Sequence, residues 1–247
     1  MDGLLSALIA AVTALVVAFL TYVLGGRRDE RARVAEESRD VNRKYLNPLR
    51  LSVVENYFRL QEIAETVKRE GRCAPLTYVQ EPATVRQQED EWFNGYGAYL
   101  VSSCYLAACL FANLGRIRRE LPFLRFTEAD DTELLGRLRS VSLGYVRHLG
   151  VFYVTQDSLG AAIERDGKLL SYRYFCQLLQ DDVEGPWFDR LLMYYIQTGE
   201  GKHADRVHEL ALALNELMTF IESAIGGTSS LRAVLDAEGH ATQRDVQ

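Results

Sequence analysis

A segment without charged side chains, Leu4 to Leu24, constrains the fold more than any other feature of the sequence. As an α-helix rising about 1.5 Å per residue, it would span the roughly 30 Å hydrocarbon core of a bilayer. Leucine, isoleucine, valine and phenylalanine make up most of the segment, which favours insertion into lipid because no charge would be buried. The sequence therefore predicts a transmembrane anchor over residues 1–26.

A cleaved signal peptide is the alternative interpretation of the same segment. Signal peptides begin with a basic region and end at small residues of the Ala-x-Ala type. This chain begins with Met1 and the acidic Asp2, and residues 22–26 offer no such cleavage site. We therefore expect the anchor to be retained.

Basic side chains flank the segment on one side only. Asp2 alone precedes it, whereas four arginines follow it closely: Arg27, Arg28, Arg31 and Arg33. The positive-inside rule then predicts that the N-terminus lies outside the cell and that everything after the anchor is cytoplasmic. The same arginines would attract the anionic lipids of the bilayer's inner leaflet.

Small residues recur at every fourth position of the anchor, at Ser6, Ala10, Ala14 and Ala18. Such a stripe lets two helix backbones approach closely and favours a homo-oligomer formed through the transmembrane helix. Alanine is common in membrane helices in general, so that a plain lipid-facing anchor is the alternative.

A second uncharged stretch runs from Phe93 to Gly115 and is long enough to cross a bilayer. Two observations favour a buried central helix instead. Polar residues such as Asn94 and Asn113 dilute the hydrophobicity of the stretch, and crossing from the cytoplasm would place the arginines at 116, 118 and 119 outside, against the charge rule. A second span is the alternative.

The chain as a whole has the composition of a globular protein, with 48% hydrophobic and 25% charged residues, and beyond the anchor its apolar residues recur with helical period. We therefore predict an all-α fold: the anchor, a charged juxtamembrane helix over 27–47, a helical bundle domain over 48–227 and a flexible tail over 228–247. Basic residues predominate beside the anchor and acidic residues beyond it. No strand pattern or internal repeat is found.

Capping residues and glycines predict where the first helix of the bundle begins and ends. Asn47 suits an N-cap before Pro48, and the helix should stop near Gly71. Its predicted buried stripe is Leu49, Val53, Tyr57, Leu60, Ala64 and Val67. The stretch from Gly71 to Asp90 is predicted to be the longest loop.

Four further helices are predicted after the central one. Thr127 and Asp130 resemble a capping box for a helix whose stripe is Leu134, Leu138, Val141, Tyr145, Leu149 and Phe152. Shorter helices follow near 158–179, with an interruption at 166–167, and near 186–197. The last helix has the stripe Val207, Leu210, Leu214, Leu217, Ile221 and Ala224, and Gly226-Gly227 would close it.

No catalytic motif is found. The cysteines at 73, 104, 109 and 176 lack zinc-ligand spacing and are predicted to be free, buried thiols in a reducing cytoplasm. Gly201-Lys202 fails as a phosphate loop because Ile196 stands where the first glycine should be and His203 where a serine or threonine is needed. We expect no cofactor, and the net charge of −6 argues against nucleic-acid binding.

One polar cluster combines residue types that bind metals: Glu200, His203, Asp205 and His208. Carboxylate–histidine pairs three residues apart occur in di-iron bundles, where they come from different helices. Here both pairs lie on one segment, with the two histidines on different sides of a helix. Helix capping and solvated charge are the preferred interpretation, and a metal site is the alternative.

Four short stretches resemble a group of uncharacterised bacterial single-pass membrane proteins with an all-helical cytoplasmic domain. They are Tyr45-Leu46-Asn47-Pro48-Leu49, Leu60-Gln61, Arg118-Arg119-Glu120 and Gln156-x-x-Leu159-Gly160. The resemblance implies architecture and no activity. With the positive-inside rule, it places the expected anchor in the inner membrane.

Three functional hypotheses follow from the sequence. The leading one is a non-enzymatic adaptor or sensor that meets a protein partner or small ligand at the inner leaflet, since an anchor is combined with a domain that lacks catalytic motifs. The second is an oligomeric membrane effector, for example a bilayer-perturbing protein of antiviral defence, which depends on the small-residue stripe and on a helix that continues from the anchor through Leu46. The third is an enzyme with an unfamiliar site near His203 and His208.

Overall fold

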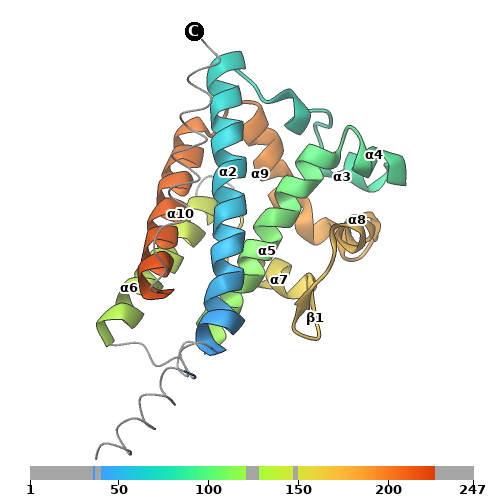
Figure 1. The fold of residues 1–247 in the computed structure, drawn as a ribbon. Helices are drawn as coiled ribbons and strands as arrows, with labels where there is room; N and C mark the ends of the chain where they lie inside the picture. The colour runs from blue at the N-terminus through green and yellow to red at the C-terminus, as the bar shows by residue number, and fades with distance from the viewer. Residues whose placement is uncertain (1–35, 37–39, 121–127, 147–149, 226–247) are drawn as a thin grey trace, which may run out of the picture. The chain divides into compact units, whose positions relative to one another are not determined.

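The computed structural model describes residue 36 and residues 40–120, 128–146 and 150–225 (Figure 1). The chain divides into two units, Met1–Lys44 and Tyr45–Gln247, and the helices below belong to the second. The predicted all-α fold is confirmed for the described residues. The longer helices are α2 (Asn47–Glu70), α5 (Ala98–Glu120), α6 (Glu128–Val146), α7 (Tyr153–Ala162), α8 (Tyr172–Gln180), α9 (Asp189–Gly199) and α10 (Ala204–Ile225).

Helix α2 packs against α10 and α5, and α6 covers α10 (Figure 1). The predicted stripe of α6 is confirmed where it is described, because Leu134, Leu138, Val141 and Tyr145 are all fully buried. The stripe of α10 is also confirmed from Val207 to Ile221, whereas the predicted Ala224 is exposed because it lies near the end of the helix. Apolar residues at helical spacing therefore form the main core.

The start of α2 differs from the prediction. Asn47 is not an N-cap, because the preceding Leu46 is itself helical (φ −74, ψ −39) and no side chain caps the helix. A π-helical turn, η1 (Asn42–Leu46), runs directly into α2, so that the backbone is already coiled where the cap was expected. The predicted end is confirmed: Gly71 adopts φ 75, and its N–H donates to the carbonyl oxygen of Val67 at 2.8 Å.

Helix α5 is the buried central helix that its composition predicted. It is the one helix of the described part that is long and apolar enough to cross a membrane, and 72% of its most apolar 18-residue window is buried inside the domain. It contacts α2, α7 and α9. The helix begins later than predicted, because residues 95–97 turn the chain between Phe93 and Ala98 and put Phe93 in a separate helix, α4 (Asp90–Asn94).

Two buried asparagines join α2 to α5. The Asn56 amide donates hydrogen bonds to the carbonyl oxygens of Ser52 and Leu106, at 2.7 and 2.9 Å. The Asn113 amide donates to the Ser52 hydroxyl at 2.7 Å. The buried face of α2 therefore runs through Asn56 and Ile63, while the predicted Tyr57 and Ala64 are only partly buried.

Three other predictions are wrong in part. The predicted loop over residues 71–90 contains a 3-10 turn, η2 (Ala74–Leu76), and a short helix, α3 (Pro82–Arg86). Phe152 was expected in a buried stripe and is 58% exposed, because it precedes α7 instead of extending α6. The chain also forms a two-stranded hairpin, β1 (Glu164–Arg165) with β2 (Lys168–Leu169).

The interruption predicted at residues 166–167 is confirmed, and it is the turn of this hairpin. Asp166 and Gly167 have φ values of 52 and 72, the left-handed conformation that a two-residue hairpin turn requires. Pro186 does not begin a regular helix; it lies in a 3-10 turn, η4 (Gly185–Phe188), that leads into α9.

Several predictions fall outside the described residues. They are the anchor at Leu4–Leu24, its flanking arginines at 27, 28, 31 and 33, the stripe Ser6/Ala10/Ala14/Ala18, Thr127, Leu149, Gly226-Gly227 and the tail over 228–247. These remain predictions of the sequence. The oligomeric effector hypothesis depends on the stripe among them and on a helix continuing from the anchor through Leu46, of which only residue 36 and residues 40–46 are described.

Candidate functional site

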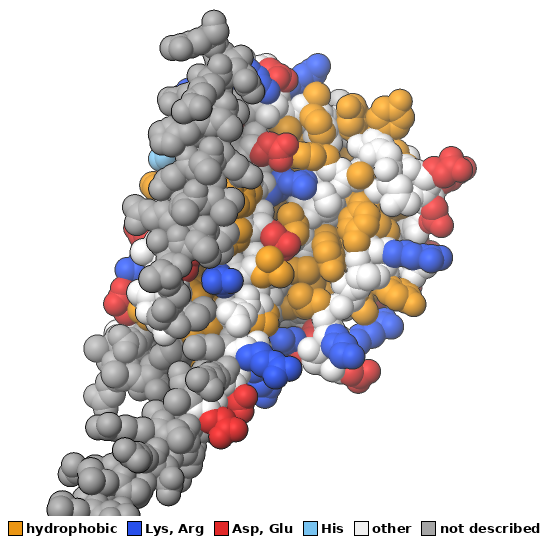
Figure 2. All heavy atoms as spheres, in the orientation of Figure 1, with side chains coloured by type: hydrophobic (Ala, Val, Ile, Leu, Met, Phe, Trp, Pro, Cys, Tyr) orange, Lys and Arg blue, Asp and Glu red, His pale blue; other side chains and the backbone are white. Residues whose placement is uncertain are grey.

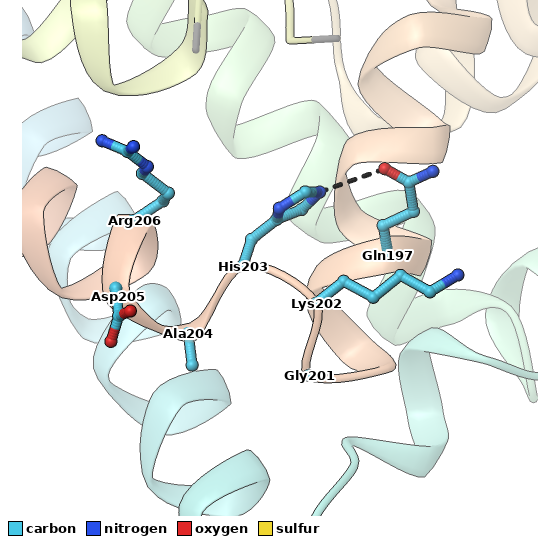
Figure 3. Close-up of a pocket in the computed structure, with 7 residues that line it drawn as sticks. All are labelled: Gln197, Gly201, Lys202, His203, Ala204, Asp205 and Arg206. Atoms are coloured by element: carbon cyan, nitrogen blue, oxygen red, sulfur yellow. Dashed lines mark hydrogen bonds between the residues drawn. The ribbon is translucent and has the colours of Figure 1, made fainter. Parts of the chain in front are cut away.

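The predicted polar cluster lies in the connection between α9 and α10 (Figure 3). Gly201 adopts φ 79 there, which lets the chain reverse between the two helices. The His203 ring points toward α9, where its Nε2 lies 3.0 Å from Gln197 Oε1, and it stacks on the buried Tyr194 ring with centroids 6.2 Å apart. His203 thus forms part of the packing between two helices.

The other members of the cluster are not brought onto His203. Glu200 pairs with Lys202 at 2.8 Å, while Asp205 and His208 are exposed on the first turns of α10. Within the described part of the chain, no group of three His, Cys, Asp or Glu side chains is placed to hold a metal ion. The alternative of a metal site at this cluster therefore gains no support from the geometry.

An open depression of about 580 Å³ lies beside the same connection. Its rim carries the side chains of Lys202, His203, Asp205 and Arg206, which Figure 3 shows extending in different directions. Lys202 pairs with Glu200, and Arg206 pairs with Glu209 at 2.9 Å. Because the charges of the two signs alternate and pair locally, the depression does not concentrate charge for a ligand of either sign.

A different surface stands out by its chemistry. Large apolar side chains are 55% to 74% exposed on and next to two sets of short elements, η2 to α4 and α8 to η4. We call the surface that they form the aromatic face. Figure 2 shows hydrophobic side chains on this side of the domain, with acidic side chains at the edge where Figure 1 places α4 and with some Lys or Arg side chains on the same face. Its members are Tyr78, Tyr96, Tyr174, Val183 and Trp187.

Contacts between sequence-distant elements hold the aromatic face together. Arg86 of α3 forms an ion pair with Asp189 at the start of α9. The Tyr172 hydroxyl of α8 donates to the Phe93 carbonyl oxygen of α4 at 2.8 Å. At the other end of α8, the Gln180 amide donates to the Gln88 carbonyl oxygen at 3.0 Å. Helices α3, α4 and α8 therefore form one connected platform.

Aromatic packing supports Tyr78 and Tyr96. Their rings meet edge to face with centroids 5.6 Å apart, although both side chains remain more than half exposed. Gly97 lets the Trp92 ring lie on the backbone, since a Cβ there would stand 2.1 Å from the ring. The turn between α4 and α5 thus presents Tyr96 outward.

Exposed carboxylates occur on the same two segments as these apolar side chains. They are Glu81, Glu89, Asp90 and Glu91 on the first, and Asp181, Asp182 and Glu184 on the second. The only exposed basic residues of the described segments 78–97 and 172–190 are Arg173 and Arg190. The backbone N–H groups of Glu184 and Val183 donate to Asp181 and lower the pKa of its carboxyl group. Exposed acidic side chains therefore outnumber exposed basic ones on the two segments that carry the aromatic face.

The aromatic face is not among the features that the sequence predicts. The sequence predicts a loop over residues 71–90 and one helical stretch where α7 and α8 are separate, so that their exposed aromatic residues have no common surface in that prediction. The available signal was compositional: tyrosine, tryptophan and carboxylates recur together in residues 78–96 and 172–187. Only the tertiary contacts bring the two segments together.

No protein-family model, curated protein or solved structure matches this chain.

Proposed function

We propose that this chain is a non-enzymatic, membrane-anchored adaptor that acts at the cytoplasmic face of the inner membrane and binds a protein partner through the aromatic face. The observation that carries the proposal is the exposure of Tyr96, Tyr174 and Trp187 on a platform of well-packed short helices. Tyrosine and tryptophan are enriched in the energetically dominant parts of protein interfaces, since each buries a large area with few rotatable bonds.

Preorganisation supports binding through this surface. The platform is tied to the core by the Arg86–Asp189 ion pair and by the Tyr172 hydrogen bond to α4. A surface that is already ordered loses little conformational entropy when a partner binds. Exposed apolar clusters of this kind in a soluble domain mark interaction sites.

Support for the membrane location comes from the sequence. Leu4–Leu24 has the length and composition of a spanning helix, and the arginines that follow it favour a cytoplasmic domain. An adaptor held at a membrane meets its partners at a raised local concentration, so that a modest interface suffices.

Site-specific photo-crosslinking in cells tests the proposal. A photoreactive amino acid replaces Trp187 or Tyr174 in the full-length chain, and Leu212, half exposed on α10, is the matched position away from the platform. We expect one discrete adduct with another protein from the first two positions and none from Leu212. Adducts from all three positions alike, or only adducts between copies of this chain, would contradict the adaptor function.

Fractionation tests the location separately. The full-length chain should sediment with membranes after cell lysis and should resist extraction with alkaline carbonate, as integral proteins do. Recovery of the intact chain in the supernatant would refute the anchor. The crosslinking result would then still test whether the aromatic face binds a protein partner.

A further inference from the structure

We propose that the partner of the aromatic face is an arginine-rich segment of another protein. This inference rests on the proposed adaptor function and specifies the chemistry of the partner. Two features of the surface carry it: the exposed aromatic rings and the sign of the charges around them.

The excess of exposed carboxylates on the two segments favours a basic partner. Gln180 lies at the junction of the two acidic segments, because its amide also lies 3.4 Å from a carboxylate oxygen of Asp90 while the next residues are Asp181 and Asp182. Charges from two remote parts of the sequence therefore act together on one surface. Complementary charge speeds association and rejects partners of the wrong sign.

The aromatic rings select arginine among basic residues. A guanidinium group is planar and weakly hydrated, so it can stack on a ring while it pairs with a carboxylate, whereas a lysine ammonium is a strongly hydrated point charge. The domain uses this arrangement internally: the Arg59 guanidinium lies 4.2 Å from the centre of the Tyr99 ring and 3.8 Å from a Glu62 carboxylate oxygen. The aromatic face has exposed rings and exposed carboxylates on the same segments, so that it offers both groups for this interaction from outside.

Two other occupants are disfavoured by charge. Anionic lipid headgroups would be repelled by the carboxylates, although tyrosine and tryptophan suit a membrane interface. A second copy of the chain, docked by two-fold symmetry, would place these carboxylates against their own copies. A basic protein segment satisfies both the apolar and the charged part of the surface.

Fluorescence anisotropy of a labelled peptide tests the inference with the full-length chain in a neutral detergent. The probe is a synthetic helical peptide with arginine and leucine at helical spacing; matched peptides carry lysine or glutamate in place of every arginine. We expect the arginine peptide to bind, the lysine peptide to bind at least about threefold more weakly because stacking is lost, and the glutamate peptide not to bind.

Variants of the chain locate the binding. Trp187→Ala should weaken binding of the arginine peptide by about tenfold, and Glu184→Lys by about fivefold with a reduced salt dependence. The matched controls are Leu212→Ala and Glu65→Lys, which change exposed side chains on α10 and α2 and should stay within about twofold of wild type. Circular dichroism establishes that each variant keeps its helical content. Tyr174→Ala replaces Trp187→Ala if the latter is misfolded.

Three results would overturn the inference: equal binding of the arginine and glutamate peptides, equal loss in Glu184→Lys and Glu65→Lys, or binding to vesicles of anionic phospholipid that Trp187→Ala abolishes. The last result would assign the face to lipid. If the arginine peptide fails while Trp187 still crosslinks to another protein in cells, the adaptor function stands and only the basic chemistry of the partner is refuted.

Discussion

The side-chain amide of Asn56 on α2 donates a 2.9 Å hydrogen bond to the carbonyl oxygen of Leu106 on α5. The same amide donates to the Ser52 carbonyl oxygen, and its own oxygen accepts from the Tyr145 hydroxyl at 3.4 Å. A fully buried side chain thus joins three elements at the centre of the domain. A buried polar group stabilises a fold only while all of its partners are present, which fixes the register of α2 on α5.

Replacing Asn56 by aspartate tests this connection. The carboxylate of Asn56→Asp keeps the shape but loses both donated hydrogen bonds and buries a charge, so the free energy of unfolding should fall by about 3 kcal/mol or more. Urea unfolding of the full-length chain in detergent, followed by circular dichroism, measures the loss. Asn215→Asp makes the same chemical change at an exposed position of α10 and should cost under about 0.5 kcal/mol. Equal effects of the two variants would contradict the structural role of Asn56.

The close approach of α7 to α5 predicts the effect of a single methyl group. A Cβ at Gly160 would stand 2.6 Å from the Ala112 backbone nitrogen and 2.8 Å from its Cα, and backbone atoms inside a helix cannot move aside. Gly160→Ala should therefore lower the free energy of unfolding by about 2–3 kcal/mol.

Gly136 on α6 is the matched control for Gly160, because a Cβ there meets no atom within 4 Å. Gly136→Ala should raise the free energy of unfolding by about 0.5–1 kcal/mol, because the unfolded chain loses conformational freedom. Both variants are compared by urea unfolding. A Gly160→Ala variant as stable as wild type would show that the two helices do not meet as described.

Buried tyrosines predict a loss of stability at alkaline pH. Burial raises the pKa of Tyr145, Tyr194 and Tyr195 above the ordinary value. Below about pH 10 these phenols are neutral in both states and contribute no pH dependence; above it, the unfolded chain ionises while the folded chain keeps its protons. The free energy of unfolding should then fall by about 1.4 kcal/mol per pH unit for each tyrosine.

Unfolding midpoints in urea measured across about pH 9 to 11.5 check this slope. Phenolate absorbance should also appear only with unfolding for these three residues. Tyr194→Phe should make the fall in the free energy of unfolding shallower by about 1.4 kcal/mol per pH unit, the contribution of one proton. The variant loses no hydrogen bond, because the Tyr194 hydroxyl is buried and unpaired in the described part of the domain. An unchanged slope in this variant would refute the assignment.

The four cysteines are expected to be unreactive in the native chain. All are free and buried, and burial raises the pKa of each thiol, to about 11 for Cys109. At pH 8 the thiolate fraction of such a group falls on the order of 100-fold below that of an exposed cysteine, and the thiolate is the reactive form. Thiol titration should detect these groups rapidly only after denaturant is added. Fast, complete reaction of the folded chain would contradict the burial.

Local signals in the sequence predicted the helical class and several of its details. Gly71 ends α2 because glycine adopts positive φ readily, and Leu134 to Tyr145 are buried because their spacing matches the helical period. The polar residues that dilute the hydrophobicity of the stretch at α5, and the arginines near its end, predicted a core helix, and the helix is mostly buried. Each of these properties depends on a residue and its near neighbours along the chain.

The tertiary structure alone decided which local elements meet. Asn56 is polar and was absent from the predicted stripe, yet it is buried because Leu106 supplies an acceptor from another helix. His203 turns to Gln197 instead of its neighbouring carboxylates, and Gln180 joins two acidic segments far apart in the sequence. Periodicity reports which side of a helix is apolar, but the partner of that side is set by long-range packing, which no local pattern encodes.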